Sequence, residues 1–244
     1  MERTISKDNL IMPEISVIIP VYNHAHTLAR SLSTLEKQTL SAKEVIIIDD
    51  GSTDNFDDVV KNFESFLKIK ILKQTNKGAN AARNFGLQFA TGDYVIFWDA
   101  DTVAVPKMLE KMITAIENNP KVSYAYSQYR FGWKKMRSHI FDPVLLKKIN
   151  YIDGTSLVRR TDLPTGGCDA SLKRFQDWDL WLTMLENKKT GIFVPEVLYK
   201  KITWGRKGIS SWLPSFMFRL PWKTRAVKEY EEAREIIARK HKLS

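Results

Sequence analysis

Four short apolar runs, separated by segments with helical spacing, constrain the fold of this chain most. The runs are rich in Ile and Val without polar alternation, which is typical of strands buried on both faces of a parallel sheet. Between them, apolar residues recur every three or four positions, as on the buried side of a helix. This alternation predicts an α/β fold, a mostly parallel central sheet with helices on both faces. The expected strands are residues 15–20, 45–48, 69–73 and 94–98, and the expected helices are 27–38, 56–66, 76–90 and a segment that starts at Pro106.

The alternation becomes less regular after residue 120. Residues 129–141 are basic and aromatic, which indicates a loop or an edge hairpin. The remaining expected elements are strands at 122–128, 155–158 and 192–197 and helices at 177–186 and 223–242.

These patterns suggest one large globular domain with two appended segments. We divide the chain into an N-terminal extension (1–13), a domain (14–210) with halves 14–120 and 121–210, and a basic tail (211–244).

The charge of the chain is concentrated near its C-terminal end. The net charge is +10, and residues 200–244 contain twelve Lys or Arg and four Asp or Glu, a difference of +8. A nearly neutral domain with a basic tail favours an anionic surface or a protein partner for the tail and disfavours nucleic-acid binding by the domain. The single cysteine, Cys168, excludes an intrachain disulfide. With no apolar run long enough for a membrane span and no secretory signal in residues 1–13, we expect a cytoplasmic protein, peripheral at most to the inner face of the membrane.

Two carboxylates, Asp99 and Asp101, directly follow the expected strand 94–98. Residues i and i+2 of an extended chain point the same way, so one strand end brings two negative charges to one place. Such a pair is costly unless a cation or a hydrogen-bonding ligand meets it. Ligands of open α/β sheets bind at the carboxyl ends of the strands, where the acids 49–50 also fall. Because the chain has neither a Gly-x-Gly-x-x-Gly nor a Gly-Lys-Ser/Thr loop, we expect a phosphate held through Mn²⁺ or Mg²⁺.

Five motifs, in this order, resemble those of family 2 glycosyltransferases of the GT-A fold. They are Ile-Ser-Val-Ile-Ile-Pro-Val-Tyr-Asn, Ile-Ile-Asp-Asp-Gly-Ser-Thr-Asp, Gly-Ala-Asn-Ala-Ala-Arg-Asn, Trp-Asp-Ala-Asp and Gln-Asp-Trp-Asp-Leu-Trp, and they extend over roughly residues 14–210. The resemblance implies inverting transfer of a sugar from a nucleotide diphosphate sugar, with a UDP-sugar favoured, to a hydroxyl of a glycan or lipid-linked acceptor. It assigns the nucleotide to residues 14–120 and the acceptor to residues 121–210, with 129–153 as the variable part of the acceptor pocket.

The resemblance also implies roles for single residues. Asp177 matches the catalytic base, which takes the proton of the acceptor hydroxyl. Asp101 matches the direct ligand of the metal, with Asp99 as a second ligand or near the ribose. Pro20, Tyr22 and Asp50 would contact the base of the nucleotide. The residues expected to bind nucleotide or substrate are Pro20, Tyr22, Asn23, Asp50, Arg83, Asp99, Gly167, Lys201 and Arg206.

The chain departs from the family pattern at two places. Many relatives have a histidine just after the last strand, where this chain has none between Tyr199 and Ser210, so Lys201, Arg206 or Lys207 would neutralise the diphosphate instead. Gln176 replaces the first acid of the usual Glu-Asp pair, which removes a neighbouring charge that would raise the pKa of the base.

Several alternatives stay open at this stage. Asp179 competes with Asp177 for the role of base, since either could cap a helix. Asp49 and Asp54 could hydrogen-bond their own backbone in a turn, and Arg83 could pair with a surface acid. Two rival functions also remain, a sugar nucleotidyltransferase of related fold and a non-catalytic glycan-binding protein. The first would need a glycine-rich basic loop after the first strand, and the second predicts the loss of the proposed metal ligand or base.

The tail combines an aromatic, proline-broken segment (211–222) with an amphipathic helix (223–242). The apolar side of this helix would contain Val227, Tyr230 and Ile237. The helix could pack on the domain, or the tail could dock on an anionic membrane surface through its aromatic residues.

Overall fold

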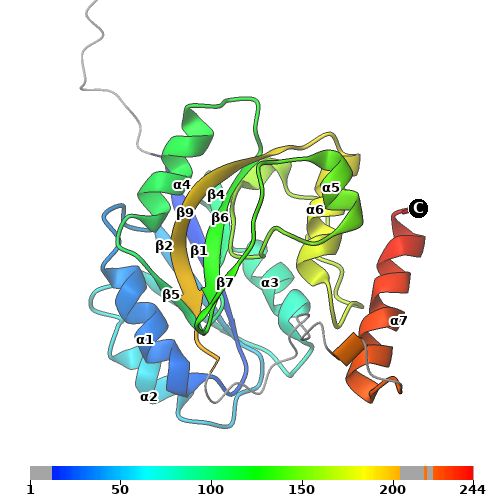
Figure 1. Cartoon of the computed structure of the whole chain (residues 1–244). Helices are drawn as coiled ribbons and strands as arrows, with labels where there is room; N and C mark the ends of the chain where they lie inside the picture. Colours follow the sequence, from blue (N-terminus) through cyan, green and yellow to red (C-terminus); the bar gives the residue numbers. More distant parts are fainter. Residues whose placement is uncertain (1–12, 204–216, 219–221, 244) are drawn as a thin grey trace, which may run out of the picture.

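A single central sheet organises the structure (Figure 1). The computed structural model of the chain describes residues 13–203, 217–218 and 222–243. Strands β1 to β4 are parallel to one another where they pair, which confirms the arrangement expected for the first half of the domain. Their bounds are β1 Ile15–Val21, β2 Glu44–Asp49, β3 Ile69–Lys73 and β4 Tyr94–Phe97.

The second half of the sheet mixes both strand directions. Its strands are β5 (Thr102–Ala104), β6 (Tyr124–Phe131), β7 (Lys134–Met136), β8 (Leu157–Arg159) and β9 (Gly191–Lys201). Among the described residues the strand order is β3-β2-β1-β4-β8-β6-β9-β5, with β7 paired to β6. β9 is parallel to β6, whereas β8 is antiparallel to both of its neighbours. β6 and β7 form the expected edge hairpin. β5 was not expected, because it is a strand only through its pairing with β9, which is distant in the sequence.

Helices cover both faces of the sheet, as expected. One core contains apolar residues of α1 (Ala25–Glu36), α2 (Phe56–Lys61) and α4 (Met108–Glu117). The other core contains apolar residues of α3 (Ala79–Leu87), α5 (Pro143–Lys148) and α6 (Gln176–Glu186), together with partly buried ones that pack against it. A short 3₁₀ turn, Arg160–Asp162, follows β8. The unexpected helix α5 starts at an Asp142 cap whose carboxylate accepts hydrogen bonds from two backbone amides, followed by Pro143 at the first helical position. This Asp-Pro pair is a helix-start signal that is present in the sequence, although no helix was expected there.

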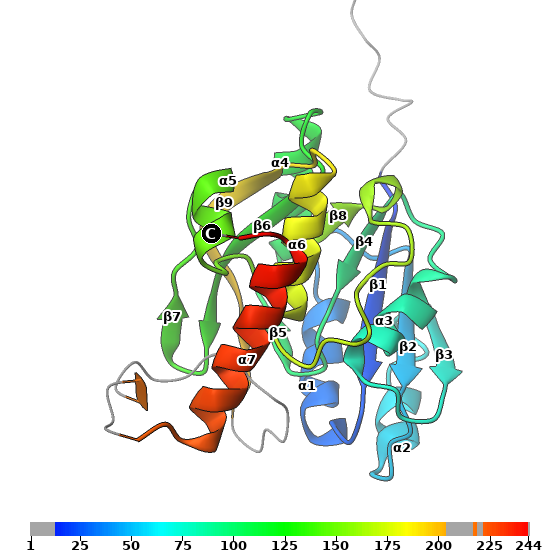
Figure 2. The ribbon, with the colours of Figure 1, turned by 90° about the vertical axis from the view of Figure 1, so that its right-hand side faces the viewer.

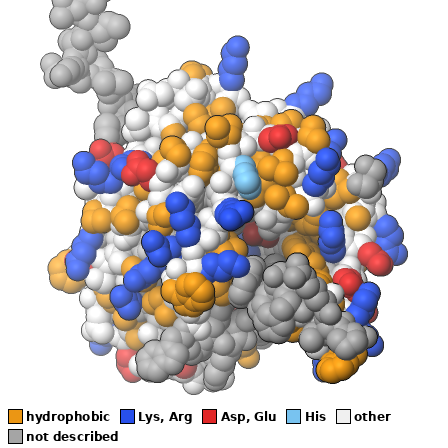
Figure 3. All heavy atoms as spheres, viewed as in Figure 1, with side chains coloured by type: hydrophobic (Ala, Val, Ile, Leu, Met, Phe, Trp, Pro, Cys, Tyr) orange, Lys and Arg blue, Asp and Glu red, His pale blue; other side chains and the backbone are white. Residues whose placement is uncertain are grey.

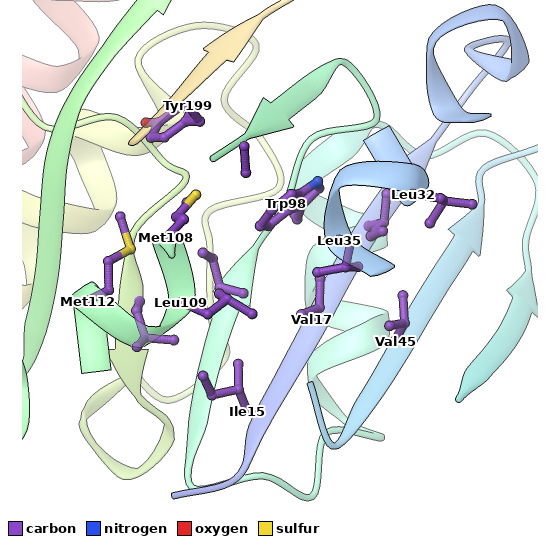
Figure 4. Close-up of a cluster of buried hydrophobic side chains, with 14 of the residues drawn as sticks. Ile15, Val17, Leu32, Leu35, Val45, Trp98, Met108, Leu109, Met112 and Tyr199 are labelled. Atoms are coloured by element: carbon purple, nitrogen blue, oxygen red, sulfur yellow. The ribbon is translucent and has the colours of Figure 1, made fainter. Parts of the chain in front are cut away.

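The two cores lie on opposite sides of the sheet because alternate strand residues point to opposite faces. Val17 packs in the core with Leu32, Leu35 and Leu109 (Figure 4), whereas the next residue, Ile18, belongs to the core on the α3 side. All are fully buried or nearly so, and each such side chain stabilises the fold by about 1.5–3 kcal/mol relative to its exposed state.

The last helix, α7 (Arg225–Lys240), packs on the domain. Val227 and Ile237 are buried, and Tyr230 and Ala233 are partly buried against the core on the α6 side. The apolar side of the tail helix is therefore covered, which confirms the packing alternative for this part of the tail. Residues 211–216 and 219–221, which include most of the aromatic segment, lie outside the described residues. None of the described helices is both long and apolar enough to cross a membrane.

The C-terminal end of α7 is attached through the imidazole of His241. Its Nε2 lies 2.8 Å from Asp179 Oδ1 and its Nδ1 lies 2.8 Å from Glu186 Oε1, both on α6. Burial alone would lower the pKa of His241, but its bonds to these two carboxylates outweigh burial and raise the pKa above its ordinary value.

We expect the contribution of His241 to folding to depend on pH. A raised pKa in the folded state means that the stabilisation is complete below the unfolded pKa of about 6.5 and disappears as the pH rises through the folded value. The free energy of unfolding, measured by urea titration at several pH values, should fall over that interval. His241→Gln should remove most of this pH dependence, and an unchanged profile in the variant would contradict the assignment.

Candidate active site

A cavity of about 400 Å³ lies beyond the carboxyl end of β4. Its walls come from α3, the residues after β4, the loop after α5, the start of α6, the end of β9, and α7. Four of the expected site residues line it, namely Arg83, Asp99, Asp177 and Lys201. Residues 14–120 and 121–210 therefore both contribute to one cavity.

Asp99 is the centre of a partly buried ion network in this cavity. Its Oδ1 lies 2.8 Å from Arg83 Nη2 and its Oδ2 lies 2.8 Å from Lys201 Nζ. Burial would raise the pKa of Asp99, but the charges of Lys201 and Arg83 hold it far below its usual range. Arg83 thus pairs with a site carboxylate and not with a surface acid.

Asp153, which is not among the site residues expected from the sequence, joins the same network. Its Oδ2 lies 2.8 Å from Lys201 Nζ, and its Oδ1 accepts hydrogen bonds from the Tyr199 hydroxyl (2.7 Å) and the Thr155 amide (2.9 Å). The Lys201 ammonium therefore lies between two carboxylates. Burial would lower its pKa, but Asp153, Asp99 and then Asp101 raise it well above the ordinary value. Because two carboxylates already balance its charge, Lys201 suits the role of a structural counter-ion better than that of a direct contact to a diphosphate.

Asp101 is buried beside this network, with 4% of its surface exposed. Its backbone carbonyl accepts a hydrogen bond from the Ile202 amide, which places it between β4 and the end of β9. Within the described residues, no group of three or more His, Cys, Asp or Glu side chains could hold a metal ion. Mg²⁺-type sites often use only one or two protein carboxylates together with substrate phosphates and water. The carboxylate of Asp101 suits such a site, although Asp101 does not itself line the cavity.

Asp177 lies in the first turn of α6 and faces the cavity. Its Oδ1 accepts hydrogen bonds from the Asn150 side-chain amide and the Trp178 backbone amide, both at 2.9 Å, so Oδ2 is the oxygen that a substrate could meet. Burial and the charge of Asp153 raise its pKa above the ordinary value. The like charge that Gln176 does not supply therefore comes from Asp153, a correction to the expectation from sequence.

Asp179 has a different task from Asp177, although only two residues separate them. It is 3% exposed, and its Oδ1 binds His241 Nε2 and Lys240 Nζ of the C-terminal segment. It does not line the cavity. Neither acid caps α6, because the cap position is Phe175, in the left-handed conformation with φ 57°.

The expected nucleotide residues at the ends of β1 and β2, Pro20, Tyr22, Asn23 and Asp50, do not line the cavity. The Asp50 carboxylate accepts hydrogen bonds from the Gln74 side chain (2.7 Å) and from the amides of Lys77 (2.8 Å) and Gly78 (2.9 Å) at the start of α3. Asn23, with φ 55°, accepts a hydrogen bond from the Thr53 amide. Pro20 pairs within the sheet, whereas the Tyr22 side chain is 47% exposed.

Three further candidates, Asp49, Asp54 and Gly167, do not line the cavity. Asp49 accepts a hydrogen bond from the Ser52 amide, the turn expected for it. Asp54 instead accepts one from the Ala25 amide at the start of α1, so its bond is not to its own turn. Gly167 has φ 75°, and a Cβ there would lie 2.3 Å from the Asn84 side chain of α3, so its position requires glycine. Arg206 and Lys207 lie outside the described residues.

Comparison with known proteins decides the family. The family model described as glycosyl transferase family 2 matches residues 16–180, more than half of the chain. The chain belongs to glycosyl transferase family 2. The resemblance found in the sequence is thereby confirmed.

The family 2 relatives with curated descriptions include proteins much longer than this chain. The uncharacterized glycosyltransferase YibD of Escherichia coli K12 is 41% identical over 120 residues, which are 48% of this chain but 35% of YibD. An uncharacterized glycosyltransferase of Haemophilus influenzae is 28% identical over 202 residues, 78% of this chain and 67% of that protein. The Escherichia coli UDP-Glc:alpha-D-GlcNAc-diphosphoundecaprenol beta-1,3-glucosyltransferase WfgD is 37% identical over 116 residues, 47% of this chain and 45% of WfgD.

Solved structures confirm the fold class. Staphylococcus aureus TarS 1–349 in complex with UDP has a TM-score of 0.68 at 22% identity, covering 77% of this chain and 60% of that one. The mannosyltransferase PcManGT of Pyrobaculum calidifontis, in complex with GDP-Man and Mn²⁺, has a TM-score of 0.66 at 19% identity, covering 92% and 70%. At these identities the likeness concerns the fold alone, and the expected GT-A arrangement is borne out.

Proposed function

We propose that this family 2 chain transfers a sugar from a nucleotide diphosphate sugar to an acceptor hydroxyl, with inversion at the sugar carbon. One observation supports this most: Asp177, a carboxylate with a raised pKa, shares one cavity with the Asp99 network that follows β4. A general base on one side of the sugar and a phosphate-binding region on the other suit a single displacement. Inversion needs no nucleophilic side chain.

The donor would occupy the part of the cavity formed by residues 14–120. Pro20, Tyr22, Asn23 and Asp50 are proposed to lie along the nucleoside, with Tyr22 offering an exposed ring. Arg83 has a buried Nε–H without a hydrogen-bond partner among the described residues, a group that a phosphate oxygen would satisfy. The nucleotides bound by TarS (UDP) and PcManGT (GDP-Man) support this class of donor, and a UDP-sugar remains our preference.

Asp101 is the residue that we propose to hold a divalent metal. Mn²⁺ or Mg²⁺ bound there would supply Lewis-acid stabilisation of the departing diphosphate, and the Mn²⁺ in the PcManGT complex supports a metal of this kind. Asp99, through its ion pairs with Arg83 and Lys201, would hold these two cations in place near the metal position.

The acceptor hydroxyl would lie next to Asp177 Oδ2. Asn150 holds Oδ1 of this carboxylate, and its own Oδ1 is buried without a hydrogen-bond partner in the described part of the chain. One acceptor hydroxyl could therefore donate to Asn150 while the attacking hydroxyl gives its proton to Asp177.

The acceptor side of the cavity is positively charged. Lys148, Lys173, Arg174 and Arg234 line it from α5, the loop before α6, and α7. These cations favour an acceptor that carries phosphate or carboxylate groups. The diphosphate-linked acceptor in the description of WfgD is of this class, and we propose a glycan or lipid-linked acceptor with an anionic group.

A hydrolysis screen over nucleotide sugars in the presence of Mn²⁺ or Mg²⁺ tests the donor and metal assignments. We expect turnover of one donor class, and we expect Asp101→Ala to reduce it by about 10²-fold or more, because loss of a bound metal removes several kcal/mol of transition-state stabilisation. Asp58→Ala, an exposed acid on α2, is the matched control and should retain activity.

Other outcomes of this screen would favour other functions. Full activity of Asp101→Ala would refute the metal site. Release of pyrophosphate from a nucleoside triphosphate and a sugar phosphate would indicate a nucleotidyltransferase. Glycan binding without turnover of any donor would indicate a non-catalytic protein.

A further inference from the structure

An unusual number of exposed apolar side chains lies between the β6–β7 turn and the end of α5. Trp133 at the turn is 88% exposed, Ile140 79%, Val144 62% and Ile149 44%. Single exposed apolar residues are common, but several in one short stretch are typical of an interaction surface. Of this stretch, only Lys148 belongs to the catalytic site proposed above.

The same stretch is strongly basic. The side chains of five of its cations are exposed: Arg130, Lys135, Arg137, Lys147 and Lys148. In the described part of the chain, none of the five forms an ion pair with an acid. The one acid between residues 130 and 149 is Asp142, whose carboxylate caps α5. The surface therefore presents uncompensated positive charge beside apolar side chains.

β7 and α5 lie on the same face of the molecule. In Figure 1 both are toward the viewer, and in Figure 2, after the turn, both lie toward the left-hand side. Figure 3 shows Lys and Arg side chains mixed with hydrophobic ones across this face. Met136, Lys148 and Ile149 also line the cavity, so the face adjoins its acceptor side.

We propose that this docking face, residues 130–149, binds an anionic lipid surface. Trp133 and the aliphatic side chains would enter the headgroup region, where tryptophan is favoured, while the cations contact lipid phosphates. A nucleic acid would satisfy the cations but offers no apolar counterpart to Ile140, Val144 and Ile149. The contact would hold the acceptor side of the cavity close to the membrane, and it differs from the tail-mediated contact considered from sequence.

Vesicle flotation with the full chain tests this proposal. Wild type should bind vesicles of phosphatidylglycerol and phosphatidylcholine at low salt, bind pure phosphatidylcholine much more weakly, and dissociate as salt rises. Each cation near such a surface strengthens binding roughly fivefold, so Lys135→Gln with Arg137→Gln should weaken it roughly 30-fold. Trp133→Ser should also weaken binding.

Trp222→Ser is the matched control, because Trp222 is 67% exposed but lies outside the docking face. It should bind like wild type, and circular dichroism should show that all variants are folded. Absence of binding by wild type, equal binding to neutral vesicles, a loss in Trp222→Ser but not in Trp133→Ser, or a stronger affinity for duplex DNA than for the vesicles would each overturn the proposal. No sugar transfer enters this test, so its failure would leave the proposed function untouched.

Discussion

Asp177→Asn is expected to abolish most sugar transfer while leaving binding of the donor intact. Asparagine keeps the size of the side chain and can keep the contact to Asn150, but it cannot take the acceptor proton. Loss of a general base typically costs about 10²–10⁴-fold in kcat. Steady-state kinetics with the donor identified by hydrolysis, and calorimetric titration of that donor, measure the two effects separately.

The pH profile gives a second, independent check on Asp177. A base must be deprotonated, so kcat/KM should fall as the pH drops through its raised pKa. Asp153→Asn removes the like charge that helps to raise this pKa, so the acidic limb should move to lower pH. Asp179→Asn is the control on the same helix, because Asp179 contacts α7 and not the cavity; it should weaken folding but keep the pH profile. Wild-type transfer by Asp177→Asn would show that the base is another residue.

Lys201→Met is expected to destabilise the fold by about 3–5 kcal/mol, because removal of one partner leaves buried charges without compensation. Both Asp99 and Asp153 would lose their common counter-ion. Urea unfolding at neutral pH measures the loss. Lys200→Met, the exposed neighbour on the same strand, is the matched control and should change stability by less than about 0.5 kcal/mol.

The pH dependence of this loss follows from the carboxylates. In wild type the pKa of Asp99 is far below its usual range, so its stabilisation is present at neutral pH and disappears only as the pH falls through that low value. Without Lys201 this pKa should rise, although Arg83 still pairs with Asp99, so protonation on acidification should relieve part of the lost compensation. The difference in stability between Lys201→Met and wild type should therefore shrink as the pH falls. An equal difference at all pH values would argue that lost packing, and not charge, is the cause.

Much of the fold was predictable because it follows from local patterns. The Ile- and Val-rich runs, their spacing and the helical periodicity between them indicate β1 to β4 and the helices that connect them. β5 and α5 were not predicted. β5 is a strand only through its pairing with β9, and the Asp-Pro signal of α5 lies in the irregular region 129–153.

The motifs of the sequence alone determined the family, the α/β class and the position of Asp99, Asp101 and Asp177, because these residues follow strands or begin a helix in a recognisable order. Only the tertiary structure decided what surrounds them. Asp153 and Asn150 come from the segment between α5 and β8, which has no recognisable pattern, and only the tertiary fold brings them to the same cavity as Asp177, which Asn150 contacts. Asp177 and Asp179 look equivalent in sequence, yet the turn of α6 directs one to the cavity and the other to His241. The role of Lys201 was likewise not predictable from the sequence. Its ammonium becomes a counter-ion only because Asp99 and Asp153, distant in the sequence, lie beside it in a poorly solvated place.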